Sequence, residues 1–122
     1  MQITDEMTKW IKALSETEGY ICHGLVNYQK GVSAVNEESD PSDPANFFPQ
    51  QCTAILKTLG TSLNNLDGGI PNKLIVEASK MTMIIFPVND TYFCGVGLTP
   101  GTETAGAINK LTELRAAFTK AL

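Results

Sequence analysis

Apolar residues recur along this chain with two periods, about 3.6 residues in three stretches and about 2 residues elsewhere. The first helical stripe consists of Met7, Trp10, Ile11 and Leu14. Thr4 or Asp5 can cap this helix, which should end near Glu18-Gly19. The second stripe consists of Cys52, Ile55, Leu56, Leu59, Leu63 and Leu66, with Pro49 suited to the first helical position and Asp67-Gly68-Gly69 as a stop. The third stripe follows a cap at Thr102 or Thr104 and consists of Ala105, Ile108, Leu111, Leu114, Ala117, Phe118 and Leu122.

Runs of β-branched and aromatic residues, bounded by turn residues, predict five strands at residues 20–27, 32–35, 74–76, 81–86 and 92–98. The first two strands flank a short turn and form a hairpin, and the last three form a meander. Residues 81–86 are apolar on both sides of the pleat, which predicts a sheet covered by helices on both faces.

These elements give the order α-β-β-α-β-β-β-α in one domain of 122 residues. The predicted fold class is α/β of the α+β type, with a five-stranded, mainly antiparallel sheet and helices on both faces. A domain of this size buries only about two thirds of its unfolded surface, so association would add to its stability.

Composition excludes several classes of function. The formal net charge is -4 and the nine Lys and Arg residues are scattered, so no basic face is available for nucleic acid. No apolar run approaches the roughly 18 residues of a membrane span, and no apolar leader is present, so we expect a cytoplasmic protein. Three cysteines, Cys22, Cys52 and Cys94, lack any metal-ligand or CxxC spacing and are expected to be reduced, structural thiols.

Residues 36–46 form an acidic segment between the second strand and the second helix. It contains Glu37, Glu38, Asp40 and Asp43 together with serines and prolines. Such a segment has too little apolar surface to fold by itself, so we expect a mobile loop that could steer basic patches on a partner. It lacks the alternating oxygen ligands and the glycine of an EF-hand loop.

No residue pattern indicates catalysis. Cys22-His23 is the one place where a thiol and an imidazole are adjacent, but neighbouring strand residues point to opposite faces. The glycines of Gly95-Val96-Gly97 precede no Lys-Ser/Thr pair, so they are more typical of close packing than of a phosphate cradle. With a single histidine, the chain offers no triad, and we assign no catalytic residue, no cofactor and no metal ligand.

The element order and the segment 81–118, with its strand, Asn/Asp turn, strand, glycine-containing loop and closing helix, resemble the Roadblock family of dynein light chains and GTPase-regulator modules, which have a profilin-like fold. The acidic loop is longer than the corresponding link in that family. The resemblance implies a homodimer in which the second helices lie side by side and the third strands join edge to edge. Here the interface would draw on Cys52, Ile55, Leu56, Leu59, Leu63, Leu74, Ile75 and Val76. An unpaired strand at residues 74–76 also invites aggregation unless a partner covers it.

The resemblance therefore predicts a non-enzymatic, homodimeric interaction module that binds, scaffolds or regulates a Ras-like small GTPase. One alternative is a profilin-like protein that binds actin or polyproline, supported by Trp10 but with only Phe118 as a second aromatic residue. Another is a small-molecule sensor domain of similar shape, which would require an internal cavity with converging polar groups.

Overall fold

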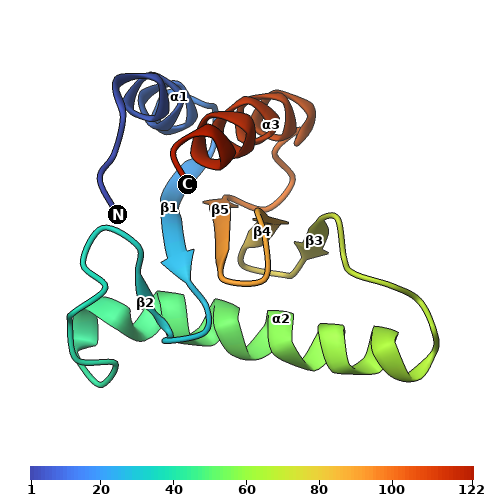
Figure 1. Ribbon diagram of the computed structural model, residues 1–122. Helices are drawn as coiled ribbons and strands as arrows, with labels where there is room; N and C mark the ends of the chain where they lie inside the picture. Colours follow the sequence, from blue (N-terminus) through green and yellow to red (C-terminus); the bar gives the residue numbers. More distant parts are fainter.

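Five strands form one antiparallel sheet in the order β2-β1-β5-β4-β3 in the computed structural model, which describes all 122 residues (Figure 1). The elements are α1 (Asp5–Ser15), β1 (Tyr20–Asn27), β2 (Val32–Ser33), the 3-10 turn η1 (Pro44–Asn46), α2 (Phe47–Asn65), β3 (Leu74–Glu77), β4 (Thr82–Pro87), β5 (Tyr92–Leu98) and α3 (Ala105–Lys120). β5 pairs with both β1 and β4, which joins the N-terminal hairpin to the C-terminal meander. The predicted element order and fold class are confirmed.

Helices cover both faces of this sheet. In Figure 1, α1 and α3 lie together on one side and α2 lies on the opposite side. The larger core is on the α1 and α3 side, where Ile84 and Phe86 of β4 pack with Leu111 and Phe118 of α3. The smaller core lies under α2 and includes Ile85, the residue between them. Consecutive residues of β4 thus enter opposite cores, which explains why this strand is apolar on both sides of its pleat.

The first third of the chain differs from prediction at two boundaries. Thr4 caps α1 as expected, because its hydroxyl accepts a hydrogen bond from the Met7 amide at 3.2 Å. The helix ends at Ser15 rather than near Glu18, and a turn leads to Gly19 with φ of +77°. A side chain there would overlap the Thr102 hydroxyl, so glycine is required. β2 has only two residues, shorter than the predicted 32–35.

The helix α2 begins at Phe47, earlier than its apolar stripe indicates, because η1 leads directly into it. Pro49 is therefore its third residue and not its first. Proline is tolerated there because amides in the first turn have no partner within a helix. The predicted stop is confirmed: Asp67 adopts a left-handed conformation with φ of 54°, and the Gly68 amide donates to the Leu63 carbonyl at 2.7 Å. Leu66 lies just beyond the helix.

The closing helix α3 packs on the sheet beside α1. Its buried residues are Ala107, Leu111, Leu114, Ala117 and Phe118. The predicted stripe is right except at its ends: Ala105 is exposed at the first turn and Leu122 lies beyond the helix. Thr104 occupies the capping position but its side chain makes no capping hydrogen bond. None of the helices combines the length and apolar character that crossing a bilayer requires.

Candidate interaction surface

The C-terminal half of α2 has no core of its own. Every buried residue of this helix lies in its first ten positions: Pro49, Cys52, Thr53 and Leu56. Figure 1 shows the far end of α2 extending beyond β3, the edge strand of the sheet. On this part of the helix Leu59 and Leu63 are only half-buried, and Ile55, one turn before Leu59, is 38% exposed. We call Ile55, Leu59 and Leu63 the α2 stripe; their four-residue spacing places them along one side of the helix.

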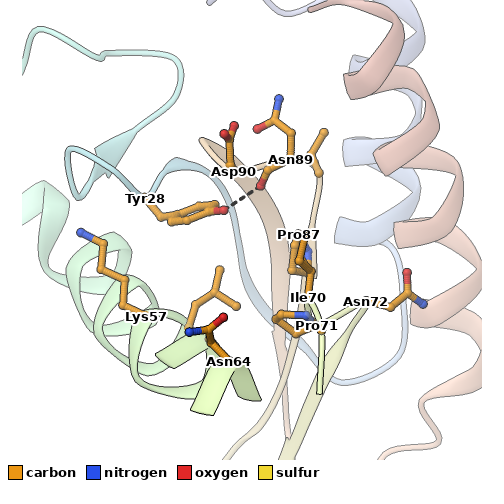
Figure 2. A pocket seen from close by; sticks show the side chains of 13 residues that line it. Tyr28, Lys57, Asn64, Ile70, Pro71, Asn72, Pro87, Asn89 and Asp90 are labelled. Carbon is orange, nitrogen blue, oxygen red and sulfur yellow. Dashed lines mark hydrogen bonds between the residues drawn. The ribbon is translucent and has the colours of Figure 1, made fainter. Parts of the chain in front are cut away.

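A cleft of about 730 Å³ opens between α2 and the end of the sheet that carries the turn between β4 and β5 (Figure 2). Lys57, Gly60 and Asn64 line it from α2, residues 69–72 line it from the chain after α2, and residues 87–90 line it from the turn between β4 and β5. The Tyr28 hydroxyl donates to the Asn89 carbonyl at 2.7 Å and holds one wall. Ile70 is 91% exposed beside the cleft, so this region presents apolar surface as well as polar groups.

The β3 strand forms the open edge of the sheet next to this region. It pairs with β4 through Leu74↔Ile85 and Val76↔Met83, and its other edge has no partner. Ile75, in the middle of the strand, is 39% exposed. The loop before β3 is fixed by Arg115, whose Nη1 donates to the Asn72 carbonyl at 2.7 Å. A held, unpaired strand of this kind can accept another strand.

The acidic loop is tied to the sheet through Glu37. Its carboxylate accepts hydrogen bonds from the α-amino group of Met1 at 2.7 Å, from the Tyr92 hydroxyl at 2.6 Å and from the Asn27 amide at 2.7 Å. These three donors, the Met1 amine most strongly, lower the pKa of Glu37 to about 2. Glu37 is therefore a structural anchor, and its charge is already compensated.

Polar contacts also order the rest of this loop. Asn46 is 2% exposed; its side-chain amide donates to Ser39 Oγ and to the Asp40 carbonyl, both at 2.9 Å, and its Oδ1 accepts from the Ser33 amide at 3.1 Å. Asp40 accepts from the Ser42 amide, and Asp43 caps η1 by accepting from the Ala45 amide. Low apolar content led us to expect a mobile segment, but hydrogen bonds hold it instead. Glu38 lies outside this hydrogen-bond network: its side chain is 95% exposed, and its Oε1 lies 4.0 Å from Lys30 Nζ.

Comparisons with known proteins address the fold. No family model matches the sequence, and no curated protein matches it either. Among solved structures, Myxococcus xanthus MglB superposes with a TM-score of 0.76 at 9% identity, covering 98% of this chain and 97% of that one. A Roadblock/LC7 domain from Streptomyces avermitilis gives 0.74 at 11% identity, with 91% and 92% covered. This chain has the Roadblock fold. An MglB with a tetrameric arrangement also matches, with a TM-score of 0.72 at 7% identity and coverage of 98% and 92%.

The expected interface residues fall into two groups according to how exposed their side chains are. Cys52 and Leu56 are 1% and 4% exposed in the core beneath α2, so they are already covered by their own sheet. Leu74 and Val76 are half-buried, whereas Ile75 and the α2 stripe are accessible. Sequence analysis missed the exposure of Ile70 and the cleft beside it. An isolated isoleucine between Gly-Gly and Pro was the available signal, because a loop residue has no strand or helix face to bury.

The candidate nucleophile pair diverges as expected from its place in β1. His23 Nδ1 lies 2.7 Å from the Tyr20 hydroxyl, and burial lowers the pKa of His23. Cys22 points the other way, with Sγ 3.0 Å from the position that a Cβ at Gly97 would occupy. The structure contains no group of three or more His, Cys, Asp or Glu side chains placed to hold a metal ion.

Proposed function

We propose that this protein is a non-enzymatic, homodimeric interaction module that binds a Ras-like small GTPase in the cytoplasm and scaffolds or regulates it. The observation that carries the proposal is the partly exposed α2 stripe, on a helix whose far end extends beyond β3, together with the unpaired edge of that strand (Figure 1). A second copy of the same chain would cover both features at once.

A second copy fits this surface because, across a twofold axis, the β3 edge of one chain faces the β3 edge of the other and the two α2 helices face each other. Antiparallel pairing of the two β3 strands would satisfy their free backbone groups and join two sheets into one. The two α2 helices would then lie side by side beneath the joined sheet, with Leu59 and Leu63 of each against the other. The half-exposed Leu74 and Val76, which are on the α2 side of the sheet, would be covered by the same contact.

Regulation of a GTPase is the part of the proposal that comes from the Roadblock resemblance. Such a module acts by contact: it shifts the population of the switch loops if it binds one nucleotide state more tightly than the other. The net charge of -4 favours a partner with a basic patch. Within the acidic loop, Glu38 is the carboxylate best placed for steering, because Glu37, Asp40 and Asp43 accept hydrogen bonds within the chain.

The profilin-like alternative loses its second aromatic residue. Phe118 is fully buried and lies 5.4 Å from the Tyr92 ring, centroid to centroid, so it is not available to a polyproline ligand. Trp10 alone remains at the surface of α1, with Lys9 Nζ 4.9 Å from its ring. The sensor alternative requires an internal cavity, whereas the cleft beside α2 is open to solvent.

Association is tested by light scattering on three proteins. We expect the wild type to have the mass of two 13.2 kDa chains at micromolar concentration. Leu59→Asp should shift the mass to one chain, since an unpaired carboxylate in an apolar contact costs several kcal/mol. Thr61→Asp is the matched control, because Thr61 is exposed on the opposite side of the same helix. A monomeric wild type at every concentration, or an unchanged Leu59→Asp dimer, would contradict the dimer.

GTPase binding is tested separately by titration calorimetry. A Ras-like GTPase from the same organism is loaded with GDP or with a GTP analogue and titrated into the wild type. We expect the two affinities to differ, because regulation by contact requires that difference. No binding would overturn the GTPase part of the proposal, and equal binding in both states would overturn regulation by contact while leaving a scaffold role. Both outcomes leave the dimer intact.

A further inference from the structure

A second hollow, of about 560 Å³, adjoins the cleft beside α2. It is lined by four residues of α3 and by three from the end of the sheet: Thr112, Arg115, Ala116, Thr119, Asn72, Pro87 and Val88. The last three also line the cleft. Figure 2 shows Asn72 turned away from Tyr28, toward α3. The cleft and the hollow together form one groove across the end of the sheet, which we call the α2–α3 groove.

The hollow contains Arg115, the one arginine of the chain. Two contacts hold its guanidinium in place: Cζ lies 4.5 Å from the centre of the Phe86 ring, and Nη1 donates to the Asn72 carbonyl at 2.7 Å. Its Nε and Nη2 groups donate to no atom of the chain, and no carboxylate pairs with it. A fixed guanidinium with free donors can bind a carboxylate through two hydrogen bonds.

The rest of the groove carries little compensating negative charge. Lys57, on the α2 wall, makes no ion pair. Asp90 is the only carboxylate that lines the groove. It lies at the Tyr28 end, where burial and then the charge of Asp90 raise the pKa of Tyr28. In a chain of net charge -4, this surface has two cations against one carboxylate, so it is complementary to an acidic partner.

The neutral part of the groove suits a peptide main chain. Asn64 and Asn72 are exposed, and their amide nitrogens donate to no atom of the chain. A side-chain amide offers a donor and an acceptor, the pair that an extended peptide presents at each residue. Ile70 is 91% exposed, and Pro71 and Pro87 also line the groove, so apolar side chains can be covered as well. Sites for small molecules enclose most of the ligand, whereas this groove is open to solvent.

We propose that the α2–α3 groove binds an extended, acidic segment of a partner protein, with a Glu or Asp side chain of that segment on Arg115 and its apolar neighbours over Ile70. At about 100° per residue, Lys57 and Asn64 lie on the side of α2 opposite Ile55, so the groove and the α2 stripe are separate surfaces. The module can then hold this segment while the α2 stripe contacts a second copy.

The test begins with a library of short linear peptides displayed on phage and selected against the full chain. Enriched sequences are synthesised with a fluorescein label, and their binding is measured by fluorescence polarisation. We expect sequences that contain Glu or Asp beside apolar residues, with an affinity that falls as salt is added. Enrichment of no sequence, or of basic sequences, would overturn the proposal.

Variants locate the selected peptide. Arg115→Gln should weaken binding by about tenfold or more, because the carboxylate loses its charged donor. That change also removes the contact with Asn72, so Thr119, exposed in the hollow one turn from Arg115, supplies an independent test. Thr119→Glu should weaken binding and Thr119→Lys should tighten it, each by about threefold. Circular dichroism checks that every variant is folded.

Asn109→Glu is the matched control, because Asn109 is exposed on α3, outside the groove and about 15 Å along the helix axis from Thr119. It should leave the affinity unchanged. The proposal is overturned if Arg115→Gln or the two Thr119 variants bind like the wild type, or if Asn109→Glu weakens binding as much as Thr119→Glu does. Peptide binding is measured, and neither association nor GTPase binding is, so these outcomes are independent of the proposed function.

Discussion

Glu37 connects the acidic loop to the sheet at a single carboxylate. Because the Met1 amine, Tyr92 and Asn27 all donate to it, its pKa in the folded protein falls to about 2. An unfolded glutamate titrates near pH 4.3, so the folded state holds the charged form more tightly than the unfolded state does. The stabilisation is therefore fully present above the unfolded pKa and is lost as pH falls through the folded pKa.

This difference predicts how a neutral substitute behaves. Glu37→Gln should lower the free energy of unfolding by about 1–3 kcal/mol at pH 7, the usual range for hydrogen bonds to a charged group. The deficit should shrink between about pH 4 and pH 2, where the wild-type carboxylate becomes protonated in the unfolded and then in the folded state. Urea unfolding of both proteins at a series of pH values measures it.

Glu38→Gln serves as the control for that experiment. Its side chain is 95% exposed and lies 4.0 Å from Lys30 Nζ, a geometry worth little at the protein surface. We expect its stability to follow the wild type at every pH. A Glu37→Gln deficit that does not depend on pH would mean that the carboxylate contributes through packing and not through its charge.

At the scale of elements, Asn46 has the largest role that sequence analysis failed to find. It links the acidic loop to β2, because it accepts from the Ser33 amide and donates to Ser39 and Asp40. Asn46→Ala should destabilise the protein by about 1–3 kcal/mol, since buried groups lose their partners. The Ser33 amide should exchange with deuterium faster, as measured by NMR.

Asn36→Ala is the matched control, because Asn36 is exposed and its side chain makes no hydrogen bond. If Asn46→Ala were no less stable than Asn36→Ala, the loop would not depend on this residue.

Gly60 gives a second test within an element. It lies inside α2, and a Cβ at this position would have nothing within 4 Å. Gly60→Ala should therefore stabilise the monomer by about 0.5–1 kcal/mol, because alanine loses less conformational entropy in a helix. The measurement is guanidinium unfolding in a Leu59→Asp background, where dimerisation is expected to be absent. Gly101→Ala offers a contrast: its surroundings are equally open but its φ is +78°, so alanine should destabilise there.

These elements show which parts of the fold the sequence encodes locally. β4 and β5 were predictable because each is a short run of β-branched and aromatic residues, and the turn residues that bound it are its neighbours in the chain. The start of α2, the length of β2 and the order of the acidic loop depend on η1 and on Asn46, whose partners are distant or irregular. The apolar side of α2 was predictable. Which of its residues are buried in the core and which remain exposed depends on how far the helix extends beyond the sheet.

At the scale of the whole molecule, the two faces of the sheet are unequally covered. α1 and α3 seal one face with a core of 14 buried residues, whereas the core beneath α2 has 5. The exposed α2 stripe, Ile70 and the β3 edge all lie on or beside the weaker side. Association through this side would complete the smaller core and pair the open edge in one step, so folding and association should be coupled.

That coupling predicts a melting temperature that depends on protein concentration. Mass action stabilises any species that binds its partner only in the folded state, so dilution from about 100 μM to about 1 μM should lower the wild-type melting temperature by several degrees. Leu59→Asp should melt at a lower temperature that does not change with dilution, and Thr61→Asp should behave like the wild type. Differential scanning fluorimetry over this range measures all three proteins. A wild type whose melting temperature is independent of concentration would mean that the chain is stable as a monomer or that its dimer contributes nothing to folding, and the α2 stripe would then need a different partner.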